Sequence, residues 1–436
     1  MSNDDHSLDT ATGGCPIGTG TSGPSPADPV GSDPGTEAVR PDAVRLLGSA
    51  FQQDPVEAYR QMRWQHGPVV PVALEDDMPA WLVIGYREVH EVLDNPQLFA
   101  RDPRRWNALD RMPEGWGLRP FVSYYPCFMF TEGAEHQRRA GAISDALAGV
   151  DQFELGSLCE RIADDVLNDF AADGKADLIA QYAERIPLLV LAKLFGLPDS
   201  EAGDLVRDMS ATVEGGEAAV DGQMRLLATM QRLLQEKRQR PGSDIPSRLL
   251  AHPEGFGAEE LIPDLLIVIT AAQQPTTCWI GNTLRLMLTD SHFAVNLSGG
   301  RRSVAQSLNE VLWEDTPTQN YLGRFAARGT QLGGQHIRAG DLVLFSLAGA
   351  NADPRVRPDP DEVSHGNNAH LSFSYGEHRC PYPAPELAEI ITKTAVEVLL
   401  DRLPDVDLAV APEDLAWRPS ILMRGLSALP VTFTPS

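Results

Sequence analysis

The stretch from His370 to Pro385 constrains the fold more than any other part of the chain. It contains a loop that ends at a single cysteine, Cys380. It reads as an extended loop with polar residues, and three prolines follow the cysteine. From Glu386 onward the apolar residues recur at helical spacing, so Cys380 lies just before a predicted helix. Unpaired amides and the dipole at a helix start favour a negatively charged sulfur. The stretch therefore predicts a site for a thiolate.

Four uses of such a cysteine are open from the residues alone. Most free cysteines are small buried hydrophobic groups. As a nucleophile, Cys380 would have a nearby base in His378. Zinc needs three or four ligands, and His365, His370 and His378 are close in sequence, but their spacing fits none of the usual zinc patterns. The fourth use is to hold a haem iron through the thiolate.

The residues around the cysteine favour the haem. Phe373, Gly376, His378 and Cys380 follow the spacing Phe-x-x-Gly-x-His-x-Cys, which resembles the haem-binding loop of the cytochrome P450 family. The resemblance covers residues 50 to 436, and it implies a mainly α fold with a small β region and one haem b. It also implies that Cys380 is the axial iron ligand and that Phe373 packs beside it. Gly376 is then a further residue of the cofactor site, and His378 holds a haem propionate.

Composition and charge set limits on partners and location. The chain has 436 residues and a formal net charge of -25, which argues against nucleic acid or an anionic membrane surface as a partner. Its 5 cysteines are scattered and odd in number, so a reducing cytoplasm is predicted rather than a disulfide framework. No signal peptide is predicted, and the longest apolar runs are far shorter than the ~20 residues of a membrane span. We expect a soluble cytoplasmic protein.

The chain divides into a polar tail and one domain. Residues 1–45 are rich in Gly, Ser, Thr, Pro and Asp, which predicts a disordered tail, and residues 46–436 are predicted to form a single domain. Residues 54–94 read as a helix, two short strands and a second helix. The irregular stretch 101–127 overlies the substrate in the family. Its aromatic residues are expected to line an apolar pocket or to anchor the loop: Trp106, Trp116, Phe121 and Tyr124.

A helix after Thr131 carries a second histidine for the cofactor. By resemblance, His136 binds a haem propionate, and the family usually has an arginine four residues later. That position is Ala140 here. Arg139 is rotated by about 100° from it on a helix, so it is a weaker candidate for the same carboxylate.

The helical pattern from Glu259 to about Asp290 is nearly uncharged in its middle, which predicts a core helix with a kink at Pro275. The matching helix of the family carries an acid and a threonine that deliver protons to oxygen. We expect Thr276 to hydrogen-bond oxygen and Gln274 to stand near the missing acid. An amide cannot relay a proton as a carboxylic acid does, so proton delivery is predicted to be altered.

Two further family motifs are present in changed form. The Glu-x-x-Arg motif reads Glu310-Val-Leu-Trp313, so the buried salt bridge of the family is missing, as in a minority bacterial branch. Donors proposed for Glu310 are His365, Asn367 and Asn368. After the cysteine, Pro381 and Tyr382 provide fewer amide bonds to the sulfur than the family's loop does. We expect this to make the thiolate more electron-donating.

Arg324 follows a strand signal and matches the family arginine that binds a propionate. The resemblance as a whole implies a monooxygenase that activates oxygen at a Cys-ligated iron and oxidises an apolar or amphipathic organic substrate. Electrons are expected from a separate ferredoxin-type donor that docks near Arg379. The alternatives are a haem-binding regulatory or partner protein with little turnover, and an enzyme of the same fold that uses peroxide or catalyses a non-oxygenase reaction.

Overall fold

A computed structural model describes residues 40–46, 51, 53–214, 216–289, 304–357 and 367–435. The predicted tail lies outside these residues up to residue 39, and so does His365. The first described strand, β1 (Val44–Arg45), already pairs with β2 (Val69–Ala73), so regular structure is present in the last two residues of the segment predicted as tail. Contacts gather the described residues into one compact unit within Val39–Ser436.

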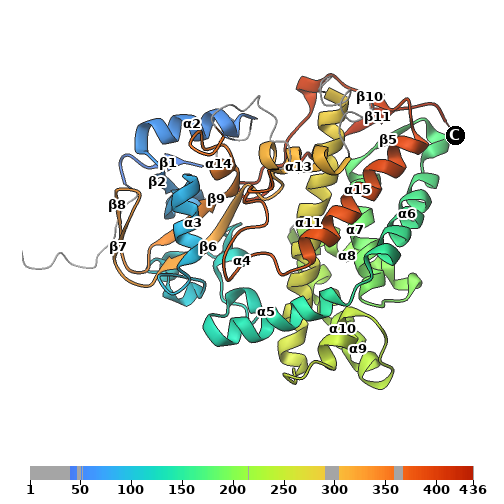
Figure 1. Cartoon of the computed structure of the whole chain (residues 1–436), viewed down its shortest axis with the longest axis horizontal. Coiled ribbons are helices and arrows are strands. Elements are labelled where there is room, and N and C mark those ends of the chain that lie inside the picture. The colour runs from blue at the N-terminus through green and yellow to red at the C-terminus, as the bar shows by residue number, and fades with distance from the viewer. Residues whose placement is uncertain are drawn as a thin grey trace, which may run out of the picture. The chain divides into compact units, whose positions relative to one another are not determined.

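Helices make up most of this unit, as the sequence predicts (Figure 1). The α-helices of the described residues are α2 (Pro55–His66), α3 (Tyr86–Asp94), α4 (Arg119–Val122), α5 (Gly133–Ala148), α6 (Gln152–Asn168), α7 (Arg185–Leu194), α8 (Asp199–Glu214), α9 (Gly216–Gln239), α10 (Ile245–Leu250), α11 (Ala258–Thr289), α13 (Val304–Glu314), α14 (Leu347–Asn351) and α15 (Ala384–Arg402). Among the described helices, none has the length and apolarity that crossing a bilayer requires.

Local signals explain where the first of these helices begins. Asp54 caps α2, because its carboxylate accepts the amide of Glu57 at 3.0 Å, and Pro55 occupies the first helical position. Gly67 then follows the helix with a φ of +78°, a conformation that favours glycine. The helix, two strands and helix predicted for residues 54–94 are confirmed.

The main sheet has six strands in the order β1-β2-β3-β9-β6-β4. The strands of the described residues are, besides β1 and β2, β3 (Pro79–Val83), β4 (Phe99–Ala100), β5 (Lys175–Asp177), β6 (Asn320–Ala326), β7 (Thr330–Leu332), β8 (Gln335–Ile337), β9 (Leu342–Ser346), β10 (Asp407–Leu408) and β11 (Pro430–Thr432). At one edge, antiparallel pairing sets Phe99 opposite Ala326 and Ala100 opposite Phe325. Continued by one residue, this register brings Arg101 opposite Arg324.

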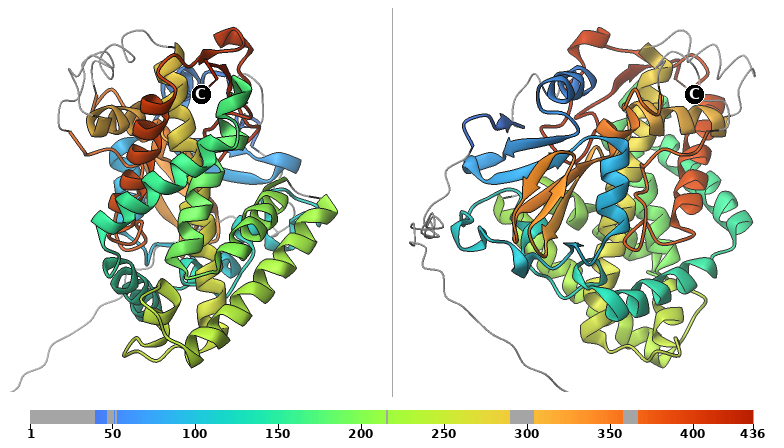
Figure 2. Two further views of the ribbon diagram at one scale, coloured as in Figure 1. Left: turned by 90° about the vertical axis from the view of Figure 1, so that its right-hand side faces the viewer. Right: turned by 60° about the vertical axis from the view of Figure 1, so that its left-hand side comes forward.

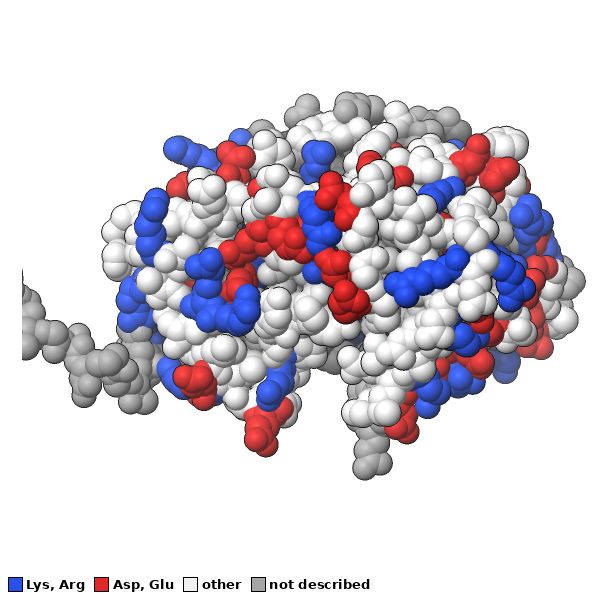
Figure 3. All heavy atoms as spheres, turned by 90° about the horizontal axis from the view of Figure 1, so that it is seen from below, with Lys and Arg blue, Asp and Glu red and all other residues white. Residues whose placement is uncertain are grey.

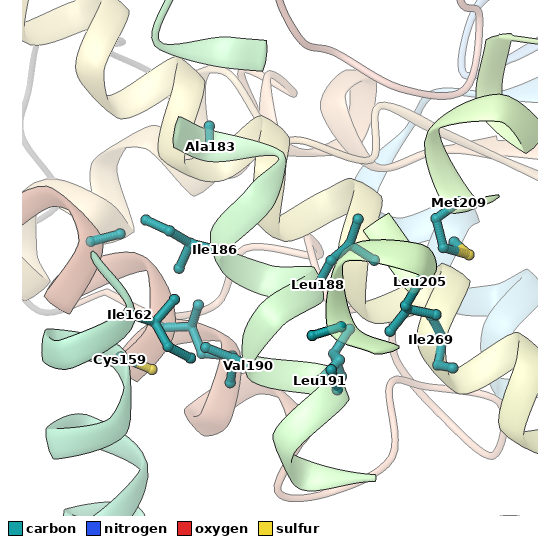
Figure 4. Packing of buried hydrophobic residues seen from close by; sticks show 14 of the residues in the cluster. Cys159, Ile162, Ala183, Ile186, Leu188, Val190, Leu191, Leu205, Met209 and Ile269 are labelled. Atoms are coloured by element: carbon teal, nitrogen blue, oxygen red, sulfur yellow. The ribbon is translucent and has the colours of Figure 1, made fainter. Parts of the chain in front are cut away.

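The helical layer has the larger core. Figure 4 shows that α7 buries both of its sides: Ile186 and Val190 lie toward Ile162 of α6, and Leu188 lies toward Leu205 of α8. The long helix α11 packs against α7 and α15, which confirms the predicted core helix. It continues as one helix through Pro263 and Pro275. Figures 1 and 2 show the segment that leads into α15 passing between the six-stranded sheet and the helical layer.

Candidate active site

The loop that ends at Cys380 is closed by its own backbone. The amide of Cys380 donates to the carbonyl of Phe373 at 3.0 Å, and the amide of Arg379 donates to the carbonyl of Gly376 at 3.3 Å. Gly376 has a φ of +75°, and a Cβ added there would lie 2.5 Å from the carbonyl oxygen of Leu93 in α3. Glycine is therefore required where the loop passes the end of α3.

The sulfur of Cys380 is in surroundings that disfavour a free thiolate. Burial raises the pKa of the Cys380 thiol to about 12, and the negative charge of Glu386 in the first turn of α15 adds to the rise. The thiolate at Cys380 stays a prediction, since burial opposes the effect expected from the helix start. A bound metal cation reverses this balance, because a thiol that coordinates a metal loses its proton.

Helices α13 and α14 fasten the chain just before the loop. The hydroxyl of Ser372 donates to the carbonyl of Leu312 at 2.7 Å, and the side-chain amide of Asn351 donates to the same carbonyl at 3.0 Å. Asn351 also accepts the backbone amide of Leu371 at 2.8 Å through its side-chain oxygen. All of these bonds are neutral and at least partly buried, so they fix the entry to the loop without an ion pair.

Trp313 takes part in the same attachment. Its indole Nε1 donates to the backbone carbonyl of Asn367 at 2.9 Å, and its ring meets His370 edge-on with centroids 5.9 Å apart. Burial lowers the pKa of His370 to about 4, so this ring is neutral near pH 7. Asn367, a predicted side-chain donor, thus takes part through its carbonyl. The partner of Glu310 stays a prediction.

A basic cluster lies beside the loop. Arg324 is 1% exposed, and its only hydrogen bond to a described residue runs from Nη1 to the carbonyl of Phe99 at 3.3 Å. Within the described part of the chain, its Nε has no hydrogen-bond partner, and neither has the buried Nδ1 of His378, whose Nε2 lies 3.9 Å from the carboxylate of Glu377. Burial, followed by the charge of Arg101, lowers the pKa of Arg324 to about 9. Burial also lowers the pKa of His378, and Arg324 contributes further.

His136 joins this cluster but already has two neighbours. Its ring centroid lies 3.8 Å from that of His378. Its Nδ1 lies 2.9 Å from the carbonyl oxygen of Phe128, and its Nε2 lies 3.2 Å from that of Glu377. The structure thus places His136 and His378 together, as the resemblance implies, but only His378 has an unpartnered ring nitrogen.

Arg139, the weaker candidate for a propionate, has a different partner. Its Nε and Nη2 donate to the carboxylate of Asp264 in α11 at 2.9 and 2.7 Å, and both side chains are buried. This pair joins α5 to α11. Arg139 therefore pairs with Asp264 rather than with a propionate. Ala140, at the position of the family arginine, has no charged side chain.

The sequence analysis missed Arg101, which follows β4. Its side chain is 1% exposed, and it donates to the carbonyls of Met129, Leu322 and Gly323. Arg101 stands in a stretch that reads as an irregular basic loop. The only signal that singles it out is the register of β4 on β6, and this register is not visible in the sequence.

The distal residues lie on two sides of α11. Thr276 is 3% exposed, and its hydroxyl donates to the carbonyl of Ala272 at 2.7 Å. Ala271 is exposed, and Gln274 and Pro275 are half-buried on the same side of the helix. The structure therefore puts Gln274 on the open side and Thr276 on the packed side. It does not bring them together at one point.

Two of the loop aromatics are core anchors. The rings of Trp106 and Trp116 stack with centroids 5.9 Å apart, and both are buried with the sheet. Phe121 and Tyr124 are 45% and 43% exposed. The anchor interpretation therefore holds for the two tryptophans.

These residues fit a haem better than a lone ion. Among the described residues, no three His, Cys, Asp or Glu side chains converge as the ligands of a metal ion would. Cys380 lies two residues after His378, and the buried Nδ1 of His378 and Nε of Arg324 have no acceptor among the described residues. Buried cations require counter-charges, and the two propionates of a haem would provide them.

No family model matches the chain. It is 29% identical over 400 residues to cytochrome P450 107B1 of Saccharopolyspora erythraea, a match that spans 90% of this chain and 98% of that protein. It is also 29% identical to vitamin D(3) 25-hydroxylase of Pseudonocardia autotrophica, over 89% of this chain and 96% of that protein. The solved structure of testerone-bound CYP154C4 from a Streptomyces species has a TM-score of 0.80 at 24% identity, and covers 90% of this chain and 98% of its own.

The relatives thus span nearly the whole domain, and the solved structure shares its fold. The family implies a haem cofactor, and the cysteine loop and basic cluster are consistent with one. Over nearly its whole length the chain is thus similar to bacterial cytochrome P450 monooxygenases and hydroxylases.

Proposed function

We propose that the protein binds haem b through Cys380 and hydroxylates or otherwise oxidises an apolar or amphipathic small organic molecule. The observation that carries the proposal is a pair of buried side chains beside the cysteine loop, the Arg324 guanidinium and the His378 imidazole, each with a nitrogen that has no hydrogen-bond partner among the described residues. When bound, the haem supplies an iron that activates dioxygen with two electrons and two protons.

The protein's own residues hold the cofactor and exclude water from it. Phe373 packs into an apolar cluster with Trp279, whose ring meets it at 5.9 Å, and so covers the loop around the sulfur. Arg324 and His378 bind the propionates, and His136 supports them once its ring releases one of the two carbonyls. Gly376 keeps the loop close to α3.

Proton handling falls to Gln274 and Thr276. In the arrangement seen, the hydroxyl of Thr276 uses its proton in the bond to Ala272, so it offers only lone pairs to a water molecule. Gln274 can orient a water molecule with its amide but cannot release a proton. We infer that protons reach the open side of α11 through water, which is slower than transfer from an adjacent carboxylic acid.

Two details of the proposal come from outside the site. One relative is a vitamin D(3) 25-hydroxylase, and the solved structure of CYP154C4 has testerone bound. These molecules are large and mainly apolar, which supports an apolar or amphipathic substrate. The electron donor is proposed to be a separate ferredoxin that docks near the exposed Arg379, one residue before Cys380.

The test is oxygen incorporation under turnover. The protein, a ferredoxin, its reductase and NADPH are incubated under ¹⁸O₂ with a panel of steroid and macrolide substrates. A product that carries one ¹⁸O atom supports the proposal. Cys380→Ala is the control and is expected to form none. Product without ¹⁸O, or equal product from the control, would count against a monooxygenase.

A second candidate is peroxide-driven oxidation of the same substrates. The observation in its favour is that Gln274 and Pro275 lie where the family has its acid. Hydrogen peroxide brings both oxygen atoms and protons, so it needs no acid on α11. If peroxide supports faster product formation than NADPH, and Gln274→Glu reverses the order, the peroxide route is favoured. No change in Gln274→Glu would remove the reason for this candidate.

A further inference from the structure

We propose that Arg101 is a haem-propionate ligand and takes the place of the arginine that is missing at Ala140. The inference rests on the haem site proposed above and adds a residue that the sequence pattern does not indicate. Arg101 and Arg324 face the same side of the sheet, because the β4–β6 register sets them opposite each other across an antiparallel pair.

The guanidinium of Arg101 is held rigidly. Nε donates to the carbonyl of Met129 at 3.0 Å, and Nη1 donates to those of Leu322 and Gly323 at 3.2 and 2.6 Å. The ring centroids of Phe130 and Tyr321 lie 5.4 and 5.1 Å from its central carbon. Its Nη2 donates to no described residue, so this nitrogen can donate a hydrogen bond to a ligand.

No described carboxylate neutralises this charge. Glu132 contacts the backbone of Arg101, but its carboxylate accepts the backbone amides of Arg101 and Asp102 and pairs with the side chain of Arg105 at 2.8 Å. A second buried arginine, Arg324, stands opposite, and the charge of Arg101 helps to lower its pKa. Two buried like charges side by side are costly unless an anion lies between them.

The other arginines near the site are not available. Arg139 is bound to Asp264, and Arg138 pairs with Glu135 and Glu260. Arg101 is thus the buried guanidinium that the β4–β6 register sets beside Arg324. A haem carries two propionates, so one carboxylate for each of the two arginines balances the charges.

Gly323 allows the backbone of β6 to lie close to the guanidinium of Arg101. It has a φ of +103°, and a Cβ added there would lie 3.0 Å from Nη1 of Arg101. Only glycine combines this backbone conformation with room for the guanidinium. The competing interpretation is that Arg101 is a purely structural crosslink between β6 and the segment before α5.

The experiment compares Arg101→Met and Arg101→Lys with Arg104→Met in the haem-loaded protein. Arg104 is the matched control, since its side chain is 61% exposed and pairs with Asp102. Two quantities are measured: the propionate-bending band in resonance Raman spectra, and the rate of haem transfer to excess apomyoglobin. The Raman band reports hydrogen bonds to the propionates, so a purely structural role would leave it unchanged.

We expect Arg101→Met to shift the propionate band and to speed haem release roughly 10- to 100-fold. This factor corresponds to the loss of one charge-assisted hydrogen bond. Arg101→Lys should shift the band less and release haem more slowly than Arg101→Met. Arg104→Met should match the wild type. An unchanged band in both Arg101 variants would overturn the proposal, even if haem release were faster.

Folding failure and cofactor failure give different results. If neither Arg101 variant yields helical protein when the cells are supplied with haem, the residue is a structural crosslink and the proposal is wrong. If the wild type itself shows no cysteinate-bound haem spectrum, the proposed cofactor site fails, and the role of Arg101 fails with it. A shifted band in a wild-type-like haem spectrum supports both.

Discussion

Arg324 is 1% exposed and has a single long hydrogen bond to a described residue, from Nη1 to the carbonyl of Phe99 at 3.3 Å. A buried guanidinium normally pairs with a carboxylate or has its donors satisfied. Here burial lowers its pKa to about 9, because little in the surrounding protein compensates for the loss of water around the charge. A ligand that supplies a carboxylate removes this cost.

Replacing Arg324 by methionine should therefore weaken haem binding more than it weakens the fold. We expect Arg324→Met to lose most of its haem during purification, because the propionate loses its best donor. The haem-to-protein ratio is measured from the Soret absorbance and a protein assay. Arg328→Met, at an exposed position just after the same strand, is the control. Full haem content in Arg324→Met would contradict the assignment.

Gly376 is the second residue with a sharp expectation. Alanine there would combine a φ of +75° with a Cβ 2.5 Å from the carbonyl oxygen of Leu93. We expect Gly376→Ala to lower the free energy of unfolding by about 2 kcal/mol or more. Gly141→Ala in α5, where an added Cβ has no neighbour within 4 Å, should be neutral or stabilising. The unfolding midpoints of the two variants in denaturant are compared. Equal midpoints would contradict the close approach of residue 376 to Leu93.

At the scale of elements, the segment 367–373 is fastened to α13 and α14 by neutral groups. Trp313 and Ser372 make bonds to backbone carbonyls of Asn367 and Leu312, and the ring of His370 lies between Trp313 and Phe373. The family uses an ion pair in this region. A neutral attachment does not weaken with salt, but it depends on His370 staying uncharged.

The segment should therefore be sensitive to acid. Burial lowers the pKa of His370 from 6.5 to about 4, so between these values the unfolded chain binds a proton that the folded chain does not. Stability thus falls as the pH drops from about 6.5 to about 4, and the loss is about 2 kcal/mol between pH 7 and pH 5.

The measurement compares the free energy of unfolding at both pH values in the wild type and in His370→Asn. Asparagine keeps an acceptor for the amide of Ser372, which donates to His370 Nδ1 at 3.3 Å. The variant should lose about 2 kcal/mol less stability on acidification than the wild type. The same pH dependence in both proteins would show that His370 is not the titrating group.

At the scale of the whole molecule, the formal net charge of -25 affects the encounter with an electron donor. On the face shown in Figure 3, basic and acidic side chains lie interspersed, and no large patch of one sign dominates. Because the net charge of the chain is negative, we expect an acidic ferredoxin to be repelled at long range.

Salt should accordingly speed the first electron transfer from an acidic ferredoxin. Raising the ionic strength from about 10 mM to about 100 mM shortens the range of the repulsion from roughly 30 Å to roughly 10 Å. Stopped-flow reduction of the haem under carbon monoxide measures the rate. An increase with salt is expected for the wild type. A steep decrease would reveal attraction by a basic docking patch, contrary to this account.

The sequence predicts those parts of the site that depend on local pattern. The Cys380 loop, the core helix over 259–290 and the strand that carries Arg324 all have short-range signals, and each element is present. Arg101 and the pair Arg139–Asp264 could not be predicted. They depend on a strand register and on a contact between residues 125 positions apart, which only the packed fold determines.

The helix-start argument for Cys380 leaves out a contribution that depends on the whole fold. It treats the sulfur as if only the helix acted on it, whereas burial in the fold dominates and raises the pKa of the thiol. Likewise, the pattern around Thr276 indicates a hydroxyl on the central helix but not which side of that helix is open. Both features depend on the packing of several elements.

The central claim is that Cys380 holds a haem iron as a thiolate. The most direct test is the carbon monoxide difference spectrum of the dithionite-reduced protein. A strongly red-shifted Soret band, absent in Cys380→Ala, is the predicted result, since only a thiolate donates enough electron density to the iron. A band typical of neutral thiol or histidine ligation in the freshly reduced wild type would contradict the claim.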